Sequence, residues 1–403
     1  MSYDAIIVGG GLAGATLGKN LAEGGKSVII LEQEQTFRDR VRGEQMHPWG
    51  IAEAKRLGIY QALKESCARE VRHLQMHQAG APPIPPRDLV ESTPHAAGSL
   101  HFKHFEMQET LLDAASKAGA EIRKGIKVVA ASGGNPPIVK VRVLDGATQT
   151  LSAHLVIGAD GRRSAMRKWG GFEVRHEPDR LALAGVMLEG MQASAYELTV
   201  IQNFQLGTAA IIAPLGNGFF RTYAGHHKAR SPDPRPLTGA ASLPRFIDAA
   251  VATGAPRQWF DGAEQVGPLA TFDCADTWVE HPFKDGIVLV GDAAASSDPS
   301  YGCGLSLTLR SVRLLRDHLL ATEDWRNAAE SYARDISEQA AALRRITGWL
   351  TELCFEPGTE ADRRRARAFG RIREDPTRMP DFVGLGPDAP SDEAARSRLF
   401  AED

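Results

Sequence analysis

The start of the chain alternates short apolar runs with an amphipathic stretch. Residues 3–8 and 27–31 are apolar and rich in β-branched side chains, as in short buried strands, and residues 14–23 between them have helical spacing. The acidic residue Glu32 closes the second strand. Strand, helix and strand in this order form a βαβ unit, whose two strands lie parallel with a right-handed crossover. The pattern therefore predicts an α/β fold with a parallel sheet.

The pattern changes in character after about residue 175. Up to that point the spacing predicts helices at 51–66 and 106–118, and strands at 71–77, 100–102, 121–123, 127–131, 139–144 and 155–157. Residues 81–94 between two of these strands form a proline-rich loop. From 175 to 274, successive β-rich stretches with one helix at 242–253 predict an antiparallel sheet. A buried strand at 286–290 and a long helix at 305–320 then restore the α/β pattern, and a mostly helical tail follows.

We therefore predict three regions. The first is a discontinuous Rossmann-like α/β domain that binds a nucleotide, and it comprises residues 1–70, 100–174 and 275–345. The second is an inserted antiparallel β-sheet domain that binds substrate, formed by residues 71–99 and 175–274. The third is a helical C-terminal region, residues 346–403.

Composition narrows the class of protein. Of the 403 residues 43% are hydrophobic and 24% charged, as in globular proteins, and the net charge of −3 gives no global attraction to nucleic acid or anionic membranes. The four cysteines, Cys67, Cys274, Cys303 and Cys354, form no CxxC pair, so neither a disulfide framework nor structural zinc is expected. The N-terminus lacks the basic start of a signal peptide, and no run reaches the ~18–20 apolar residues of a membrane span. We expect a cytoplasmic, soluble protein.

A glycine-rich segment follows the first strand. Gly9 permits a tight turn, Gly11 removes a side chain that would block phosphates, and Gly14 lets the helix approach the strand. A diphosphate would meet backbone N–H groups and the positive end of the helix dipole here. Glu32 stands eighteen residues after Gly14, where a carboxylate accepts hydrogen bonds from an adenosine ribose. This acid suits FAD or NAD and repels the 2′-phosphate of NADP.

Two further segments place an aspartate directly after a buried strand. Asp160 follows residues 155–157 and stands before a short helix. Asp292 follows residues 286–290 at the carboxyl edge of the predicted sheet, where ligands collect, and its carboxylate suits a ribityl hydroxyl. Gly302 and Gly304 then open the long helix, whose free N–H groups suit the flavin edge that becomes anionic on reduction.

The three segments together resemble the single-component FAD-dependent monooxygenases of the para-hydroxybenzoate hydroxylase type, the group A flavoprotein hydroxylases, over about residues 3–345. The resemblance implies an FAD-binding domain, a substrate sheet, and NADH or NADPH that binds transiently without a Rossmann domain of its own. It also implies that the reduced flavin captures O2 as a C4a-hydroperoxide.

The resemblance assigns roles to single residues. It implies that Gly9, Gly11, Ala13 and Gly14 contact the diphosphate, that Glu32 contacts the ribose, and that Asp160 lies near both the diphosphate and the passing nicotinamide nucleotide. It places Asp292 on the ribityl chain, Gly302, Gly304 and Leu305 at the isoalloxazine edge, Gln108 on the ribityl or ribose side, Pro299 beside C4a, and Arg42 on FAD, where it also steers the nicotinamide. The sequence departs from the family at Ser306 and at Arg310-Ser311, where asparagine and Asp-Ala are common.

Other residues have simpler interpretations. His47, in a loop expected over the flavin, is a candidate to orient or deprotonate a phenolic substrate, or else a packing residue. His73 and His77 share a strand face, but no acidic partner repeats at ligand spacing, so no metal is expected. The basic run at 363–373 alternates with acids and lacks interleaved aromatic residues, which favours a solvated helix or subunit contact over nucleic acid.

We therefore predict an FAD-dependent monooxygenase that uses NAD(P)H and O2 to hydroxylate, or epoxidise, a small organic substrate, with an aromatic ring preferred. Its residues for catalysis would be Arg42, His47 and Pro299. An FAD-dependent reductase of the geranylgeranyl-reductase type stays open, as does a flavin-containing regulatory protein, whereas a flavin halogenase is disfavoured because no Trp-x-Trp occurs. A homodimer and a separate flavin reductase also stay open as partners.

Overall fold

The first sheet carries the N-terminal βαβ unit. The computed structural model describes residues 3–41, 43–142, 146–230 and 235–402. In these residues β1 (Tyr3–Val8) lies between the parallel strands β2 (Val28–Glu32) and β11 (Thr148–Gly158). The sheet continues to β8 (Glu121–Lys124) on one side, and to β21 (Ile287–Leu289) and β20 (Phe283–Lys284) on the other. Strands β9 (Lys127–Ser132) and β10 (Ile138–Arg142) extend β11 as an antiparallel addition. Thus residues 287–289 return to the sheet that residues 3–8 begin.

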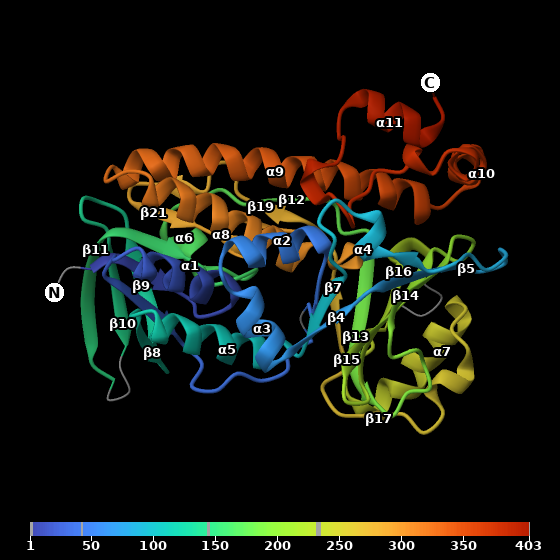
Figure 1. Cartoon of the computed structure of the whole chain (residues 1–403), viewed down its shortest axis with the longest axis horizontal. Helices are drawn as coiled ribbons and strands as arrows, with labels where there is room; N and C mark the ends of the chain where they lie inside the picture. Colours follow the sequence, from blue (N-terminus) through green and yellow to red (C-terminus); the bar gives the residue numbers. More distant parts are fainter. Residues whose placement is uncertain (1–2, 42, 143–145, 231–234, 403) are drawn as a thin grey trace.

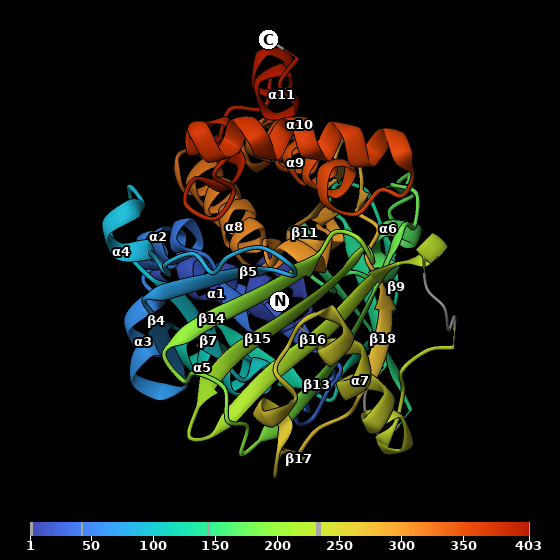
Figure 2. The same ribbon diagram turned by 90° about the vertical axis from the view of Figure 1, so that its right-hand side faces the viewer.

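A second large sheet stands beside the first (Figure 1). Its strand order is β17-β13-β16-β15-β14-β5-β6, with β18 also paired to β13. The strands are β5 (His73–Gln78), β6 (Arg87–Asp88), β13 (Leu181–Glu189), β14 (Glu197–Asn203), β15 (Thr208–Gly216), β16 (Phe219–His227), β17 (Glu264–Gln265) and β18 (Ala270–Asp273). Figure 2 shows this sheet face-on, with α7 (Leu243–Thr253) packed on its outer face. The predicted α/β fold with an inserted antiparallel sheet is therefore confirmed.

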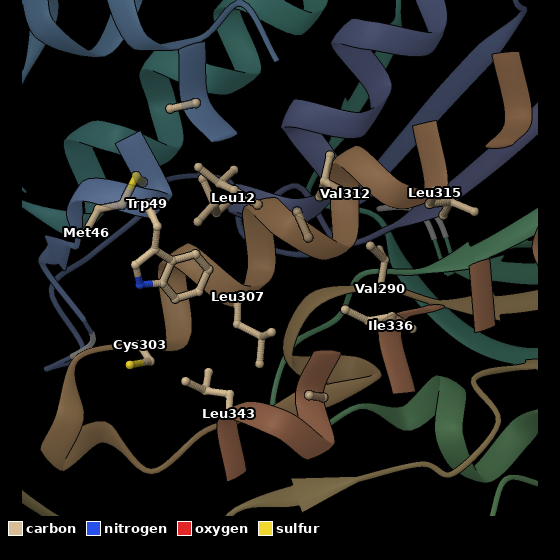
Figure 3. Close-up of a cluster of buried hydrophobic side chains, with 14 of the residues drawn as sticks. Leu12, Met46, Trp49, Val290, Cys303, Leu307, Val312, Leu315, Ile336 and Leu343 are labelled. Atoms are coloured by element: carbon tan, nitrogen blue, oxygen red, sulfur yellow. The ribbon is translucent and has the colours of Figure 1, made fainter. Parts of the chain in front are cut away.

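Helices pack on both large sheets. Helices α1 (Leu12–Glu23), α8 (Gly304–Leu320) and α9 (Trp325–Cys354) pack together. Figure 3 shows their shared core, where Leu12, Leu307 and Val312 meet Ile336 and Leu343. The remaining helices are α2 (Pro48–Arg56), α3 (Tyr60–Ser66), α4 (Leu89–Ser92), α5 (His104–Lys117), α6 (Ala165–Trp169), α10 (Thr359–Glu374) and α11 (Glu393–Phe400). The helical C-terminal region thus lies above the second sheet (Figure 2).

Three local predictions differ from the structure. The helix predicted at 51–66 is two helices, because Gly58 adopts φ +65° and the amide of Ile59 donates to the carbonyl of Ala54, which ends α2. The loop at 81–94 contains β6 and α4, the latter capped by Asp88. Strand β5 joins β14 in parallel, so the second sheet is mixed at this edge. In the described part of the chain, no helix is both long enough and apolar enough to cross a membrane.

Two small sheets connect parts of the chain that belong to the large ones. One consists of β3 (Gln45–Met46), β7 (Ser99–Phe102) and β4 (Ala68–Val71), and it carries the chain from the first sheet to the second. The other consists of β12 (Arg175–His176), β19 (Thr277–Trp278) and β22 (Ala295–Ser296). Both link residues far apart in sequence, so they fix the two large sheets around the space between them.

Candidate active site

A cavity of about 2030 Å³ lies between the two large sheets and the C-terminal region. Single ligand pockets span ~300–1,000 Å³, so this cavity has room for two ligands. The glycine-rich segment, the segment at Asp160 and the segment from Asp292 to Leu305 all contribute to its lining. Arg42 lies outside the described residues. Of the other predicted site residues, the lining includes Gly9, Gly11, Ala13, Glu32, His47, Gln108, Asp160, Asp292, Pro299, Gly302, Gly304 and Leu305.

Two glycines shape the turn between β1 and α1. Gly9 has φ +106°, and a Cβ there would lie 2.4 Å from the carbonyl oxygen of Ala159. A Cβ at Gly14 would lie 1.9 Å from the carbonyl oxygen of Gly9. Both contacts are with backbone, which cannot move aside cheaply. Gly14 is therefore required for the helix to approach the strand, and it supports the site without lining it.

Gly11 has open space where its side chain would be. The nearest atom to a Cβ there is Nε2 of Gln108, on α5, at 3.7 Å. Within the described residues, no side chain caps α1 and no acid occupies its first turn. Uncapped N–H groups at a helix N-terminus bind anions. The residues present therefore fit the diphosphate of a dinucleotide.

Glu32 is buried at the end of β2, where it organises the loop around it. Its Oε2 accepts a hydrogen bond of 2.7 Å from the amide of Gly10, and its Oε1 accepts one of 2.8 Å from the amide of Glu34. Each carboxylate oxygen has a further lone pair. Glu32 therefore both holds the glycine-rich segment and keeps acceptors for ribose hydroxyls.

Asp160 follows β11 and caps the first turn of α6. Its Oδ2 accepts hydrogen bonds from the amides of Ala165 at 2.7 Å and Met166 at 3.0 Å. Its Oδ1 is buried and has no hydrogen-bond partner among the described residues. A buried acceptor without a partner costs ~1–3 kcal/mol, and a ligand hydroxyl or ordered water removes that cost. This oxygen fits a nucleotide ligand at the cavity wall.

Asp292 lies in a short 3-10 helix, Gly291–Ala293, directly after the first sheet. The buried guanidinium of Arg167 donates to the carbonyl oxygens of Asp292 at 2.6 Å and Ala293 at 2.8 Å. Oγ of Ser311 accepts a hydrogen bond of 2.9 Å from the amide of Gly291. The turn that carries Asp292 is thus held from both sides while its side chain lines the cavity.

The segment before α8 is a second tight turn. Pro299–Tyr301 forms a 3-10 helix in which Oδ1 of Asp298 accepts a hydrogen bond of 2.8 Å from the amide of Ser300. Gly302 follows with φ +66°, and α8 begins at Gly304 with no side-chain cap among the described residues. A second uncapped helix N-terminus therefore faces the same cavity, as at α1.

Arg310 and Ser311, where the sequence departs from the family, have structural partners. Nε of Arg310 donates at 2.7 Å to Oε1 of Glu53, which is fully buried on α2. Nη2 of Arg310 donates at 2.7 Å to Asp388 in the C-terminal region. Arg310 thus ties α8 to α2 and to the C-terminal region, and Ser311 supports the turn at Asp292. Arg310 and Ser311 therefore anchor the helix and its neighbouring turn, and neither lines the cavity.

His47 is buried at the N-terminus of α2, and both of its ring nitrogens have protein partners. Nε2 donates a hydrogen bond of 2.8 Å to the carbonyl oxygen of Tyr301, and Nδ1 accepts one of 3.2 Å from the side-chain Nε2 of Gln45. Burial lowers the pKa of His47, so the ring is neutral. This geometry favours a role in positioning the Pro299–Tyr301 turn. The predicted catalytic role stays a prediction.

The variant His47→Gln separates these two roles. If His47 only positions the turn, the variant will lose ~1–3 kcal/mol of unfolding free energy through two weakened hydrogen bonds. Its pH–rate profile will keep the shape of the wild-type profile. Loss of one limb at unchanged stability would instead identify His47 as the acid or base.

The structure contains a buried charge cluster that the sequence did not predict. Arg221 on β16 is 1% exposed, and its Nη2 lies 2.7 Å from Oδ1 of Asp39 and 3.0 Å from Oε1 of Glu44. The hydroxyl of Tyr223, two residues on, donates at 2.5 Å to Oε2 of Glu44. Glu44 and Tyr223 line the cavity. The cluster therefore joins the loop after β2 to the second sheet next to the predicted flavin position.

Two buried carboxyl groups stand next to the Pro299–Tyr301 turn. The amide of Asp298 donates a hydrogen bond of 2.5 Å to Oδ1 of Asp276. Burial, together with the neighbouring charge of Asp298, raises the pKa of Asp276 to about 7, and burial raises the pKa of Asp298 to about 6. From pH ~4 to 7 the folded protein thus binds more protons than the unfolded chain, and stability falls as pH rises through this window.

Asp276→Asn tests this linkage, because asparagine keeps the acceptor oxygen and removes the titration. We expect the variant to be more stable than the wild type at pH 8, on the order of 1–3 kcal/mol, and the gain to vanish towards pH 4. Urea unfolding at several pH values measures the difference, with the exposed Asp261→Asn as control. A gain that does not change with pH would contradict the raised pKa.

The chain is similar to a known protein family and to individual proteins of known sequence or structure. A profile described as FAD binding domain matches residues 2–343. Digeranylgeranylglycerophospholipid reductase 1 of Methanococcoides burtonii is 27% identical over 316 residues, 75% of this chain and 71% of that protein. Rifampicin monooxygenase of Streptomyces venezuelae is 27% identical over 377 residues, 90% of this chain and 74% of that protein. The crystal structure of p-nitrophenol 4-monooxygenase from Pseudomonas putida DLL-E4 shares the fold, with a TM-score of 0.78, 18% identity, and coverage of 96% of this chain and 98% of that one.

Proposed function

Since the chain belongs to the FAD binding domain family of FAD-dependent oxidoreductases, we propose that it is a monooxygenase that inserts one oxygen atom of O2 into an organic substrate. One observation carries the proposal: the three cofactor segments and an apolar sheet face bound the same cavity. Reactions of this type need a positioned substrate and a site from which water is excluded, more than a protein nucleophile. An apolar wall opposite the flavin edge supplies that exclusion. The similarity to a protein named rifampicin monooxygenase supports the same reaction.

In this proposal the chain's own residues bind and orient the cofactor. The N-terminus of α1, with Gly11 and Ala13, holds the diphosphate, Glu32 the adenosine ribose, and Asp292 the ribityl chain, with Gln108 and Asp160 nearby. The N-terminus of α8, at Gly304 and Leu305, faces the isoalloxazine edge, and its dipole stabilises negative charge there. Bound FAD supplies the electron transfer and the reaction with O2, and NADH or NADPH reduces it.

Isotope labelling tests the reaction. FAD-loaded protein is supplied with NADH or NADPH, ¹⁸O2 and a panel of candidate substrates, and products are analysed by mass spectrometry. The proposal requires substrate-dependent NAD(P)H oxidation and one ¹⁸O atom in the product, with hydroxylation of an aromatic ring expected more often than epoxidation. A product without label would contradict it.

The second candidate is an FAD-dependent reductase, which the similarity to a protein named digeranylgeranylglycerophospholipid reductase favours. Such an enzyme transfers reducing equivalents from FAD to a carbon–carbon double bond and needs no O2. Turnover that continues under strict anaerobiosis, with a product two hydrogen atoms heavier than the substrate, would select this function over oxygen insertion.

A further inference from the structure

The second sheet presents one face to the cavity, and this face is apolar. Alternate residues of a strand point to opposite faces. On β15, Ala209, Ile211 and Ala213 line the cavity, whereas Ala210 and Ile212 pack with α7. On β5, β14 and β16 the cavity side chains are Leu74, Met76, Leu198, Val200, Gln202 and Tyr223. Towards the two sides of the sheet, β6 adds Arg87, and β18 adds Ala270, Thr271, Phe272 and Asp273. The central strands β5, β14, β15 and β16 thus present only Gln202 and Tyr223 as polar side chains to the cavity.

The C-terminal region forms the opposite wall, and it too is apolar. The larger apolar side chains that line the cavity from this region are Leu350, Cys354, Phe355, Phe369, Met379, Phe382, Val383 and Leu385. The polar side chains of the same wall are Thr377, Arg378, Asp381 and Arg398. The wall is fixed at both ends. Arg87 on β6 donates two hydrogen bonds to Asp381, at 2.8 and 2.7 Å, and Phe369 stacks on Phe204 at 4.9 Å between ring centroids. We call the space between β5, β14, β15 and residues 350–398 the apolar half of the cavity.

Three charged groups around the apolar half are paired within the protein. The guanidinium of Arg87 pairs with Asp381, and that of Arg398 with Asp375 at 3.4 Å. Glu44 pairs with Arg221, as described above. A charged substrate would have to break one of these pairs or enter an apolar region without a partner, and both are costly. The apolar half therefore selects against carboxylates and ammonium groups.

The volume of the cavity indicates the size of the substrate that it can hold. The cavity of about 2030 Å³ is twice the ~1,000 Å³ upper end of the range for a single ligand pocket. A dinucleotide at the glycine-rich segment leaves a volume suited to another ligand near that upper end. Ala209 and Ala213 contribute to this space because they project only a methyl group from the sheet.

We propose that the apolar half binds an uncharged, predominantly hydrocarbon substrate larger than one aromatic ring. This inference rests on the proposed function and names its substrate class, which is larger than the small substrate predicted from the sequence. The hydrocarbon body packs between β14–β15 and residues 379–385. The amide of Gln202 and the hydroxyl group of Tyr223 meet its few polar atoms.

The test is equilibrium binding to the oxidised, FAD-loaded protein without NAD(P)H, followed by the change in the flavin absorption spectrum. The probes are phenol, 4-hydroxybenzoate, 17β-estradiol and all-trans-farnesol. Estradiol carries a phenol ring within a fused-ring skeleton, whereas farnesol is an isoprenoid chain, so the two distinguish the source of the hydrocarbon. We expect at least one of them to bind about tenfold or more tightly than both small probes, because more apolar area is buried.

Ile211→Trp narrows the apolar half, since Ile211 is half-buried on the cavity face. We expect it to weaken binding of the large probe about tenfold or more and to leave phenol within about twofold. Leu206→Trp, at an exposed position before β15, is the matched control and should change neither. Thermal unfolding of both variants shows whether a loss of binding reflects a loss of folding.

The outcomes are distinct for the two proposals. If phenol or 4-hydroxybenzoate binds as tightly as both large probes, or if no probe perturbs the flavin up to its solubility limit, the substrate class is wrong, whatever the labelling experiment shows. If a large probe binds tightly and Ile211→Trp abolishes this, the substrate class holds even where no ¹⁸O enters the product. A product without ¹⁸O would contradict only the proposed oxygen insertion.

Discussion

Gly11→Val will give a folded protein that does not retain FAD. The backbone of Gly11 has φ −75°, which any residue adopts, and the nearest atom to a Cβ there is 3.7 Å away. The protein alone therefore accommodates the side chain, at a cost of ~1 kcal/mol for valine at a helix N-cap. The diphosphate of FAD would no longer fit, because the valine side chain fills the position proposed for it. We expect the affinity for FAD to fall about 100-fold or more, which is ~3 kcal/mol of charge-assisted hydrogen bonds lost.

Substitutions at two other glycines serve as controls for this result. Gly14→Ala places a Cβ 1.9 Å from a backbone oxygen and should impair folding itself. Gly348→Ala, at an exposed site in α9 with no atom within 4 Å, should retain FAD and gain ~0.5–1 kcal/mol of stability. The measurements are the flavin-to-protein absorbance ratio after gel filtration, FAD titration calorimetry and urea unfolding of the apoprotein. Wild-type FAD affinity in a folded Gly11→Val protein would show that the diphosphate lies elsewhere.

Arg221→Met will strongly destabilise the folded protein. The side chain of Arg221 is 2% exposed, and its removal leaves the carboxylates of Asp39 and Glu44 buried without their cation. Breaking a buried ion pair by removing one partner costs ~3–5 kcal/mol. Arg257→Met is the matched control, because its ion pair with Asp248 is 61% and 63% exposed and such pairs contribute ~0–1 kcal/mol.

Urea unfolding of the apoprotein measures both variants. The triple variant Arg221→Met, Asp39→Asn, Glu44→Gln should recover part of the loss, because it removes the uncompensated charges as well. A loss below about 1 kcal/mol for Arg221→Met, equal to that of Arg257→Met, would show that the buried cluster contributes no more than a surface pair.

The residues predicted to bind the cofactor line one cavity, and the sequence could indicate them because each signal is local. Their roles in binding stay predictions. A strand that ends in glycines and leads into a helix specifies its own turn, as at Gly9 and Gly14, and an acid at the end of the next strand must lie beside it. The order of such units along the chain then indicated the α/β sheet and the place of Asp292.

The substrate side depends on contacts that no local pattern shows. Arg221 is one polar residue in an alternating strand, where it would ordinarily face solvent, and its partners are 182 and 177 positions away in the sequence. The same holds for Arg310, whose partner Glu53 is 257 positions distant. The break between α2 and α3 is different, because Gly58 was a visible signal for a helix end. Residues 379–385 belong to the region that the sequence predicted as mostly helical, and their place in a wall of the cavity follows only from the tertiary structure.

The walls shared by the two parts of the cavity have a thermodynamic consequence. The cofactor segments and the apolar half line one cavity, so we expect FAD and a ligand in the apolar half to influence each other's binding. Suppose that a substrate slows the loss of FAD and tightens the binding of FAD by some factor. Linkage then requires that FAD tightens the binding of this substrate by the same factor. Retention of the yellow colour on dilution thus reports which molecules occupy the neighbouring half, before any product has been found.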